Sequence, residues 1–213
     1  MEKLLIDVSH HNGNIDFGEV KSDKQNISGV IIRAGFGRYV SQKDKRFEKN
    51  YAGAAAAGLD IGAYWYSYAT TPNEAVTEAK ACLKVIDGKK FNYPIYFDIE
   101  DKCQLYLSRA VCSDMVKSFC SYLEERGYFA GVYSFDSFFE TNINETVPQR
   151  FSAWVARINS SGDDIIKPSH CKSYAMHQYS WKGTVSGISG SVDMNLCYKN
   201  FPAIIKRAGL NGC

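Results

Sequence analysis

The chain has 213 residues, of which 45% are hydrophobic and 14% aromatic, enough to bury the core of a single barrel-sized domain. A formal net charge of +2 excludes the strongly basic face of a nucleic-acid-binding protein and allows only weak attraction to an anionic surface such as a cell wall. The seven cysteines match no zinc signature, which predicts mostly reduced thiols, several of them packed as small hydrophobic side chains.

The N-terminal segment indicates where the protein is made. Its apolar stretch spans only three residues before a charge, which is too short for a signal peptide. No segment approaches the roughly 20 consecutive apolar residues of a membrane span. We therefore expect synthesis in the cytoplasm, no transmembrane segment and a separate route of release.

Strand-like and helix-like segments alternate along most of the chain. Strands are predicted at 4–9, 29–35, 61–68, 94–100 and 129–135, and helices at 16–23, 45–57, 71–86 and 108–126. After a short irregular stretch at 137–144, strands follow at 151–158, 174–179 and 192–198 without a long helix, before a C-terminal helix at 201–208. Five βα units followed by three strands with little helix predict an α/β fold, a modified TIM-like barrel. We expect one domain over residues 1–213, because no linker or repeat divides the sequence.

Two carboxylates end the fourth predicted strand. Asp98 and Glu100 follow an apolar, aromatic run that begins at Pro94. Residues i and i+2 of a strand point to the same face, so the two side chains lie together. Mutual repulsion and burial then raise their proton affinity. One protonated and one ionised carboxyl are what acid–base cleavage of a glycosidic bond requires.

Other polar and aromatic residues lie near the remaining strand ends, where barrels of this kind carry their chemistry. The candidates for binding or supporting roles are Asp7, Arg33, Tyr64, Tyr133, Trp154, Gln178 and Asp193. Aromatic faces beside carboxylates suit a carbohydrate cleft, because they stack on the apolar faces of sugar rings. Alternation places Tyr64 and Tyr66 on one face of their strand and Trp65 on the other.

Structural roles compete with these assignments. Asp7 has the alternative of capping a turn, and Asp193 that of pairing with Arg33. The adjacent His10 and His11 point apart on an extended segment and have no partner at ligand spacing, so a turn or cleft-rim role is favoured over a metal site. No cofactor and no metal are predicted.

Several segments, in this order and spacing, resemble the glycoside hydrolase family 25 lysozymes, the muramidases found among phage endolysins and bacterial autolysins. The matching segments are residues 6–9, 12–13, 15–17, 30–37, 44 with 47 and 50, 58–64, 94–100, 154–156, 178–179 and 192–195. The D-x-E pair of the family falls on Asp98 and Glu100, and its other acidic positions fall on Asp7 and Asp193. Trp65 departs from the pattern, because relatives often carry His there.

The resemblance implies hydrolysis of the β-1,4 bond between N-acetylmuramic acid and N-acetylglucosamine in peptidoglycan. Glu100 would be the general acid, and Asp98 would act through the 2-acetamido group of the substrate. A water-activating base that gives inversion is the open alternative for Asp98. The barrel would be catalytic, and the sequence shows no separate wall-binding domain.

The expected biological role is cell lysis by a phage endolysin that waits in the host cytoplasm for a holin-dependent pore. A bacterial autolysin and a chitinase-like glycosidase on a similar barrel are the alternatives. A non-catalytic wall-binding barrel is disfavoured by the intact Asp98 and Glu100.

Overall fold

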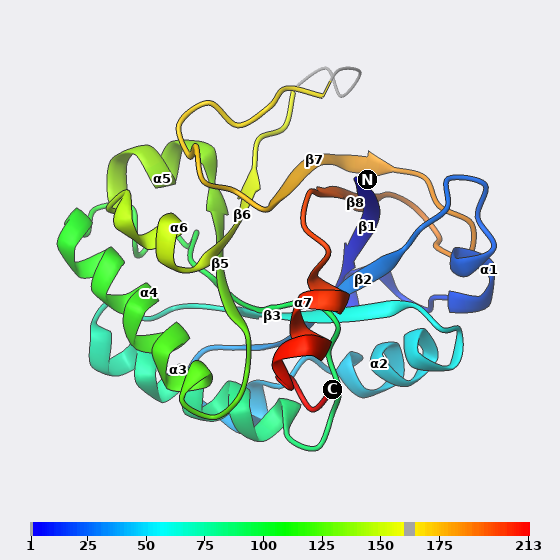
Figure 1. The fold of residues 1–213 in the computed structure, drawn as a ribbon, viewed down its shortest axis with the longest axis horizontal. Helices are drawn as coiled ribbons and strands as arrows, with labels where there is room; N and C mark the ends of the chain where they lie inside the picture. Colours follow the sequence, from blue (N-terminus) through cyan, green and yellow to red (C-terminus); the bar gives the residue numbers. More distant parts are fainter. Residues whose placement is uncertain (1, 160–164) are drawn as a thin grey trace.

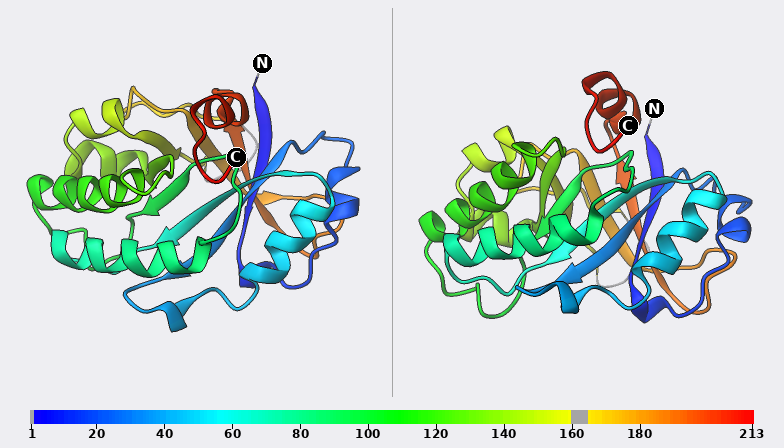
Figure 2. Two further views of the ribbon diagram at one scale, coloured as in Figure 1. Left: turned by 60° about the horizontal axis from the view of Figure 1, so that its bottom comes forward. Right: turned by 90° about the horizontal axis from the view of Figure 1, so that it is seen from below.

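Eight strands close into one barrel in the computed structural model, which describes residues 2–159 and 165–213 (Figures 1 and 2). In order around the barrel they are β1 (Lys3–Val8), β2 (Gly29–Phe36), β3 (Asp60–Tyr66), β4 (Ile95–Asp98), β5 (Ala130–Phe135), β6 (Ser152–Ala156), β7 (Met176–Gly183) and β8 (Val192–Cys197). Strands β1 to β7 run parallel, and β8 lies antiparallel between β7 and β1. The predicted α/β fold and modified TIM-like barrel are confirmed.

Helices cover most of the barrel's circumference (Figure 1). They are α1 (Phe17–Lys21), α2 (Phe47–Ala56), α3 (Pro72–Ile86), α4 (Arg109–Glu124), α5 (Asp136–Asn142), α6 (Thr146–Arg150) and α7 (Phe201–Ala208), with 3₁₀ turns η1 (His10–Asn12) and η2 (Val40–Gln42). The longest helices start at side-chain caps, where Thr71 and Ser108 accept from backbone amides of α3 and α4. None of the helices that the structure describes is long and apolar enough to cross a membrane.

Two of the differences from the sequence expectation concern the end of β4 and the segment after β5. Strand β4 ends at Asp98, so Glu100 lies just beyond it, although the Ile99 amide still bonds to the Tyr133 carbonyl at 3.0 Å. The stretch predicted to be irregular contains the short helix α5, and α6 follows it. Neither helix is long enough to show a clear 3.6-residue hydrophobic pattern. Their helical conformation therefore depends on packing against the barrel.

The last strands lack covering helices. The segment 184–191 between β7 and β8 is a loop, and a connection this short can return only an antiparallel strand. Between β6 and β7, the described residues 157–159 and 165–175 also contain no helix. The antiparallel β8 closes the barrel and thereby removes the open edges of the sheet.

Alternating side chains divide the core into two layers. Ile6, Val8 and Phe97 face outward into the layer between sheet and helices, whereas Leu5 and Tyr96 fill the barrel interior. Phe201 and Ile205 of α7 pack into that interior from the end where both termini lie (Figure 2). One end of the barrel is therefore filled with apolar side chains, and the opposite end, where β1 to β7 finish, is free for polar groups.

Candidate active site

A cavity of about 410 Å³ lies at the carboxyl ends of the parallel strands, and we call it the barrel-mouth cavity. Its lining consists of Asp7, Ser9, His11, Asn12, Arg33, Tyr64, Tyr66, Asp98, Glu100, Tyr133, Phe135, Trp154, Ile158, Gln178, Trp181 and Asp193. All nine site residues predicted from the sequence belong to this set. They come from strands far apart in the sequence, and barrel closure brings them together.

Asp98 and Glu100 share the cavity as the two-residue period requires, while Ile99 between them is fully buried on the outer side. Burial and the charge of Glu100 raise the pKa of Asp98, and the Arg33 guanidinium opposes this increase. Burial raises the pKa of Glu100 to about 7, although the Tyr133 hydroxyl lowers it. Asp98 Oδ1 and Glu100 Oε2 are buried and have no hydrogen-bond partner among residues 2–159 and 165–213.

A second carboxyl pair joins the two strands that close the barrel. Asp7 on β1 and Asp193 on β8 are direct partners in the antiparallel register. Burial and the Asp193 charge raise the pKa of Asp7 well above its ordinary value, and burial also raises that of Asp193. Asp7 is therefore the member of the pair whose ionisation is opposed both by burial and by a neighbouring carboxylate.

Amide side chains hold Asp7 in place. Asp7 Oδ2 accepts hydrogen bonds from Gln178 Nε2 at 2.9 Å and from Asn195 Nδ2 at 2.8 Å. Gln178 Oε1 accepts in turn from the Tyr133 hydroxyl at 2.8 Å. Asp7 therefore does not cap a turn; the side chain that caps η1 is Ser9, which accepts from the His11 amide.

Aromatic rings form much of the cavity wall. The Trp154 ring meets Tyr64 edge-on, with ring centroids 6.1 Å apart, and lies 4.4 Å from the centroid of Tyr133. Trp65 faces away from the cavity, is fully buried, and donates its indole N–H to the Gly37 carbonyl at 2.9 Å. The predicted alternation along β3 is confirmed, and the departure at Trp65 lies in the outer core rather than in the cavity wall.

Arg33 is held by a different carboxylate from the one that the sequence suggested. Its Nε donates to Asp44 Oδ2 at 2.9 Å, and its terminal nitrogen lies 2.8 Å from the same oxygen. His10 contacts both, with Nδ1 at 2.9 Å from Asp44 Oδ2. Asp44 is buried, and its backbone and side-chain hydrogen bonds offset the effect of burial so that its pKa is lowered. The alternative pairing of Asp193 with Arg33 is therefore wrong.

Sequence reasoning did not include several residues that contribute to the site. Asn195 is fully buried and bridges Asp7 to Trp154, whose Nε1 donates to Asn195 Oδ1 at 2.7 Å. Its position two residues after Asp193 on a strand was the available signal. Trp181 and Phe135 line the cavity with 50% and 41% of their surface exposed, as rim residues able to stack on a ligand.

The histidines and cysteines form no metal centre in the described part of the chain. No group of three or more His, Cys, Asp or Glu within residues 2–159 and 165–213 is arranged to hold an ion. His10 and His11 lie in the η1 turn, and His11 lines the barrel-mouth cavity. All seven cysteines are free thiols, five of them buried.

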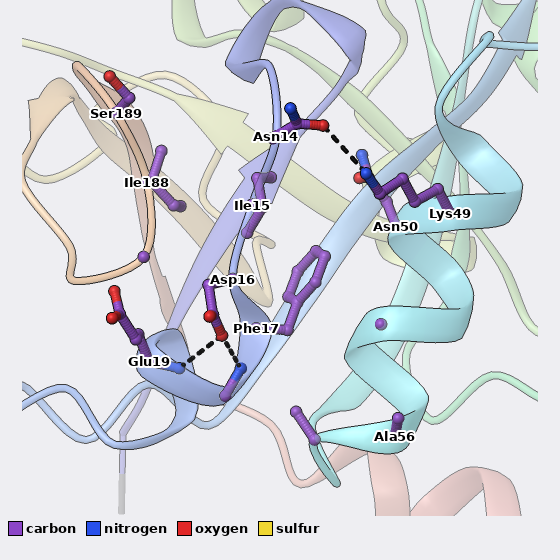
Figure 3. Close-up of a pocket in the computed structure, with 14 residues that line it drawn as sticks. Asn14, Ile15, Asp16, Phe17, Glu19, Lys49, Asn50, Ala56, Ile188 and Ser189 are labelled. Atoms are coloured by element: carbon purple, nitrogen blue, oxygen red, sulfur yellow. Dashed lines mark hydrogen bonds between the residues drawn. The ribbon is translucent and has the colours of Figure 1, made fainter.

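A larger cavity, of about 1030 Å³, lies outside the barrel mouth between α1, α2 and the β7–β8 loop (Figure 3). Its described lining contains neither Asp98 nor Glu100, and the acidic side chains in that lining are Asp16 and Glu19. Asp16 is occupied in accepting hydrogen bonds from the amides of Gly18 and Glu19. The smaller cavity, with its clustered carboxyls of raised pKa, is therefore the candidate active site.

Comparisons with known proteins agree with this geometry. The profile of "Glycosyl hydrolases family 25" matches residues 6–188. The chain is 33% identical over 190 residues to the autolytic lysozyme of Clostridium acetobutylicum, which covers 89% of this chain and 54% of that protein. It thus spans about half the length of this relative.

Two solved structures share the fold over nearly the whole chain. The CTP1L endolysin superposes with a TM-score of 0.81 at 27% identity, covering 96% of this chain and 70% of the endolysin. The bacterial lysozyme of Streptomyces coelicolor superposes with a TM-score of 0.80 at 27% identity, covering 97% and 96% of the two chains.

Proposed function

This chain belongs to family 25 of the glycosyl hydrolases, and on that basis we propose that it is a lysozyme. The proposed reaction is hydrolysis of the β-1,4 bond between N-acetylmuramic acid and N-acetylglucosamine in peptidoglycan. The observation that carries the proposal is the pair Asp98 and Glu100. Each has a buried oxygen without a hydrogen-bond partner in the described part of the chain, and both line one aromatic-walled cavity. Buried polar atoms are normally hydrogen-bonded, so these two await partners from a ligand.

Glu100 is the proposed general acid. A pKa of about 7 keeps a large fraction of this carboxyl protonated near neutral pH, while leaving it acidic enough to give up the proton. Its Oε2 is the oxygen without a partner, and we assign it to the glycosidic oxygen. As the bond from the anomeric carbon to this oxygen breaks, the oxygen takes the Glu100 proton and leaves as a hydroxyl.

Asp98 is the proposed partner of the substrate's 2-acetamido group. Its free Oδ1 would accept the acetamido N–H, which orients the acetamido carbonyl oxygen for attack on the anomeric carbon. Water then opens the resulting ring, giving its proton to the Glu100 carboxylate, and the configuration is retained. Arg33, whose charge favours the ionised form of Asp98, would support this role.

Asp7, Asp193 and Gln178 are proposed to support the pair rather than react. The raised pKa values of Asp7 and Asp193 reduce the tendency of both groups to carry charge beside Glu100, while Gln178 fixes both Asp7 and Tyr133. The partly exposed Tyr64 ring provides an apolar face for sugar stacking, and the buried rings of Trp154 and Tyr133 form the wall behind it.

Mass spectrometry of digested peptidoglycan tests the reaction. Products with reducing-end N-acetylmuramic acid are expected. Reducing-end N-acetylglucosamine would replace the proposal with a glucosaminidase, and activity on chitin oligomers alone would replace it with a chitinase.

Proton NMR of the first-formed anomer tests the step at Asp98: the β-anomer supports retention, whereas the α-anomer indicates inversion with Asp98 as base.

The proposed cellular role is that of a phage endolysin, with residues 1–213 forming one catalytic domain. The similar proteins include both an endolysin and an autolytic lysozyme, so the likeness supports lysis of a cell wall in either setting. Expression in a host with and without a co-expressed holin tests this role. Lysis that depends on the holin is expected, and lysis without it would favour an exported autolysin.

A further inference from the structure

The larger cavity is a groove outside the barrel mouth, between α1, α2 and the β7–β8 loop, and we call it the α1–α2 groove. Its floor is apolar, formed by Ile15, Phe17 and Ile188, with Ala56 and Ala57 on the α2 side (Figure 3). The Phe17 ring packs against Gly53, where a Cβ would come within 2.7 Å of it. Helix α1 has only five residues and does not fill the space beside α2. The volume of the groove, about 1030 Å³, is at the upper end of the range for ligand-binding cavities.

The walls of the groove are fixed by hydrogen bonds between distant segments. The Asp16 amide donates to the Gly187 carbonyl at 2.9 Å, and Ile15 pairs with Ile188 in an antiparallel bridge. The Ser186 amide donates to Asp23 Oδ2 at 2.8 Å. A groove whose walls are held in this way binds a ligand without first ordering a loop.

One buried polar atom in the groove has no partner. Asn50 is 2% exposed and lines the groove, yet its Nδ2 makes no hydrogen bond to any residue that the structure describes. Figure 3 shows this amide beside Asn14 and Lys49. Because an unpaired buried donor costs free energy, it indicates a hydrogen-bond acceptor that binds there.

The groove is also bipolar. Lys49 Nζ and Arg46 Nη1 both donate to Asn14 Oδ1, at 3.0 and 2.7 Å. Neither of these two side-chain charges forms an ion pair with a carboxylate of the described residues. Glu19 lies at the other side of the groove, again with no ion pair in the described part of the chain (Figure 3). The complementary ligand carries a carboxylate and amide oxygens at one end and an amino group at the other.

One segment of the chain connects the groove to the barrel-mouth cavity. Asn12 lines that cavity, Asn14 lines the groove, and only Gly13 separates them in the chain. We propose that the α1–α2 groove binds the stem peptide that peptidoglycan carries on its muramic acid units, with its carboxylates at Lys49 and its diamino-acid amine at Glu19. This proposal rests on the proposed function, because it concerns a side branch of the same polymer.

Kinetics on two forms of one polymer test the groove. Intact peptidoglycan is compared with the same glycan strands after an amidase has removed the stem peptides. Lys49→Glu should lower kcat/KM on the intact polymer by about three- to tenfold, and on the stripped strands by a clearly smaller factor. Asn50→Asp should act in the same direction. Lys84→Glu, an exposed charge reversal on α3, is the matched control and should change the two rates equally.

Direct titration with a soluble stem tetrapeptide gives a second readout. Chemical-shift changes should fall on residues of the groove, and binding should weaken in Lys49→Glu and at higher salt. The proposal would be overturned if Lys49→Glu lowered kcat/KM by the same factor on both polymers and the tetrapeptide did not bind. Binding of stripped glycan strands in the groove would also overturn it. If the wild type cleaves neither polymer, the proposed function fails, and the peptide titration still decides whether the groove binds a peptide.

Discussion

Asn195 Nδ2 donates a 2.8 Å hydrogen bond to Asp7 Oδ2 across 188 residues of sequence. The other end of the same amide accepts from the Trp154 indole. One buried side chain on β8 thus positions both a carboxyl and an aromatic wall of the barrel-mouth cavity.

Replacing Asn195 with Leu should therefore destabilise the protein and impair activity together. The substitution leaves the buried Trp154 N–H without a partner and removes one donor from Asp7. We expect the free energy of unfolding to fall by about 2–4 kcal/mol, measured by urea denaturation. Asn73→Ala, at an exposed position of α3, should stay within about 0.5 kcal/mol. If Asn195→Leu also changed the free energy of unfolding by no more than about 0.5 kcal/mol, the structural role assigned to Asn195 would be wrong.

Glu100→Gln should abolish cell-wall hydrolysis while the fold persists. The amide keeps the size of the carboxyl but has no proton to give, so we expect a loss of about 10³-fold or more in turnover. Circular dichroism and the thermal midpoint should match or exceed the wild-type values, because a buried carboxyl is removed. Exposed Glu125→Gln serves as the control. Near-native turnover of Glu100→Gln would exclude Glu100 as the acid.

The pH profile of kcat/KM should respond in opposite directions to two substitutions near Glu100. Activity needs the protonated carboxyl, so the wild-type rate should decline above about pH 7. Tyr133→Phe removes a hydroxyl that lowers the pKa of Glu100, so the decline should move to higher pH. Asp193→Asn removes a charge that raises this pKa, so the decline should move to lower pH.

Tyr198→Phe, outside the barrel-mouth cavity, should leave the profile unchanged. A wild-type profile that is flat between pH 6 and 9, or shifts of the same sign in the two variants, would contradict the assignment of Glu100 as the titrating acid.

Glu78 should make stability depend on pH. It is fully buried on α3, its Oε1 accepts from the Tyr68 amide at 3.0 Å, and its Oε2 has no hydrogen-bond partner among the described residues. Burial raises its pKa from 4.5 to about 7. A raised folded-state pKa means that the folded state binds the proton more tightly. Its contribution is therefore complete below about pH 4.5 and is lost as the pH rises through 7.

Glu78→Gln should remove that loss, so that at pH 8 the variant is more stable than the wild type by about 2–3 kcal/mol, with little difference at pH 4. Glu74→Gln is the contrasting substitution. Hydrogen bonds from Thr70 lower the pKa of Glu74, so its contribution exists above about pH 4.5 and is lost on acidification. Parallel pH dependences of unfolding in the two variants would contradict these signs.

The sequence by itself determined the barrel class and nine of the residues that line the barrel-mouth cavity. Strand alternation has a fixed period of two, so Asp98 with Glu100, and Tyr64 with Tyr66, must share a face wherever the strands lie. Parallel strands in a barrel also finish at one end, which brings Asp7, Trp154 and the other strand-end residues to one mouth. These features depend on local geometry and order along the chain.

Only the tertiary structure decided which side chains touch. Arg33 pairs with Asp44 rather than Asp193 because the loop after β2 folds back over the strand end, and Asn195 meets Asp7 because β8 returns antiparallel. The increase in the pKa of Glu100 and the open α1–α2 groove also arise from the tertiary structure. Burial, close contact and empty volume arise from segments far apart in sequence, and no local pattern encodes them.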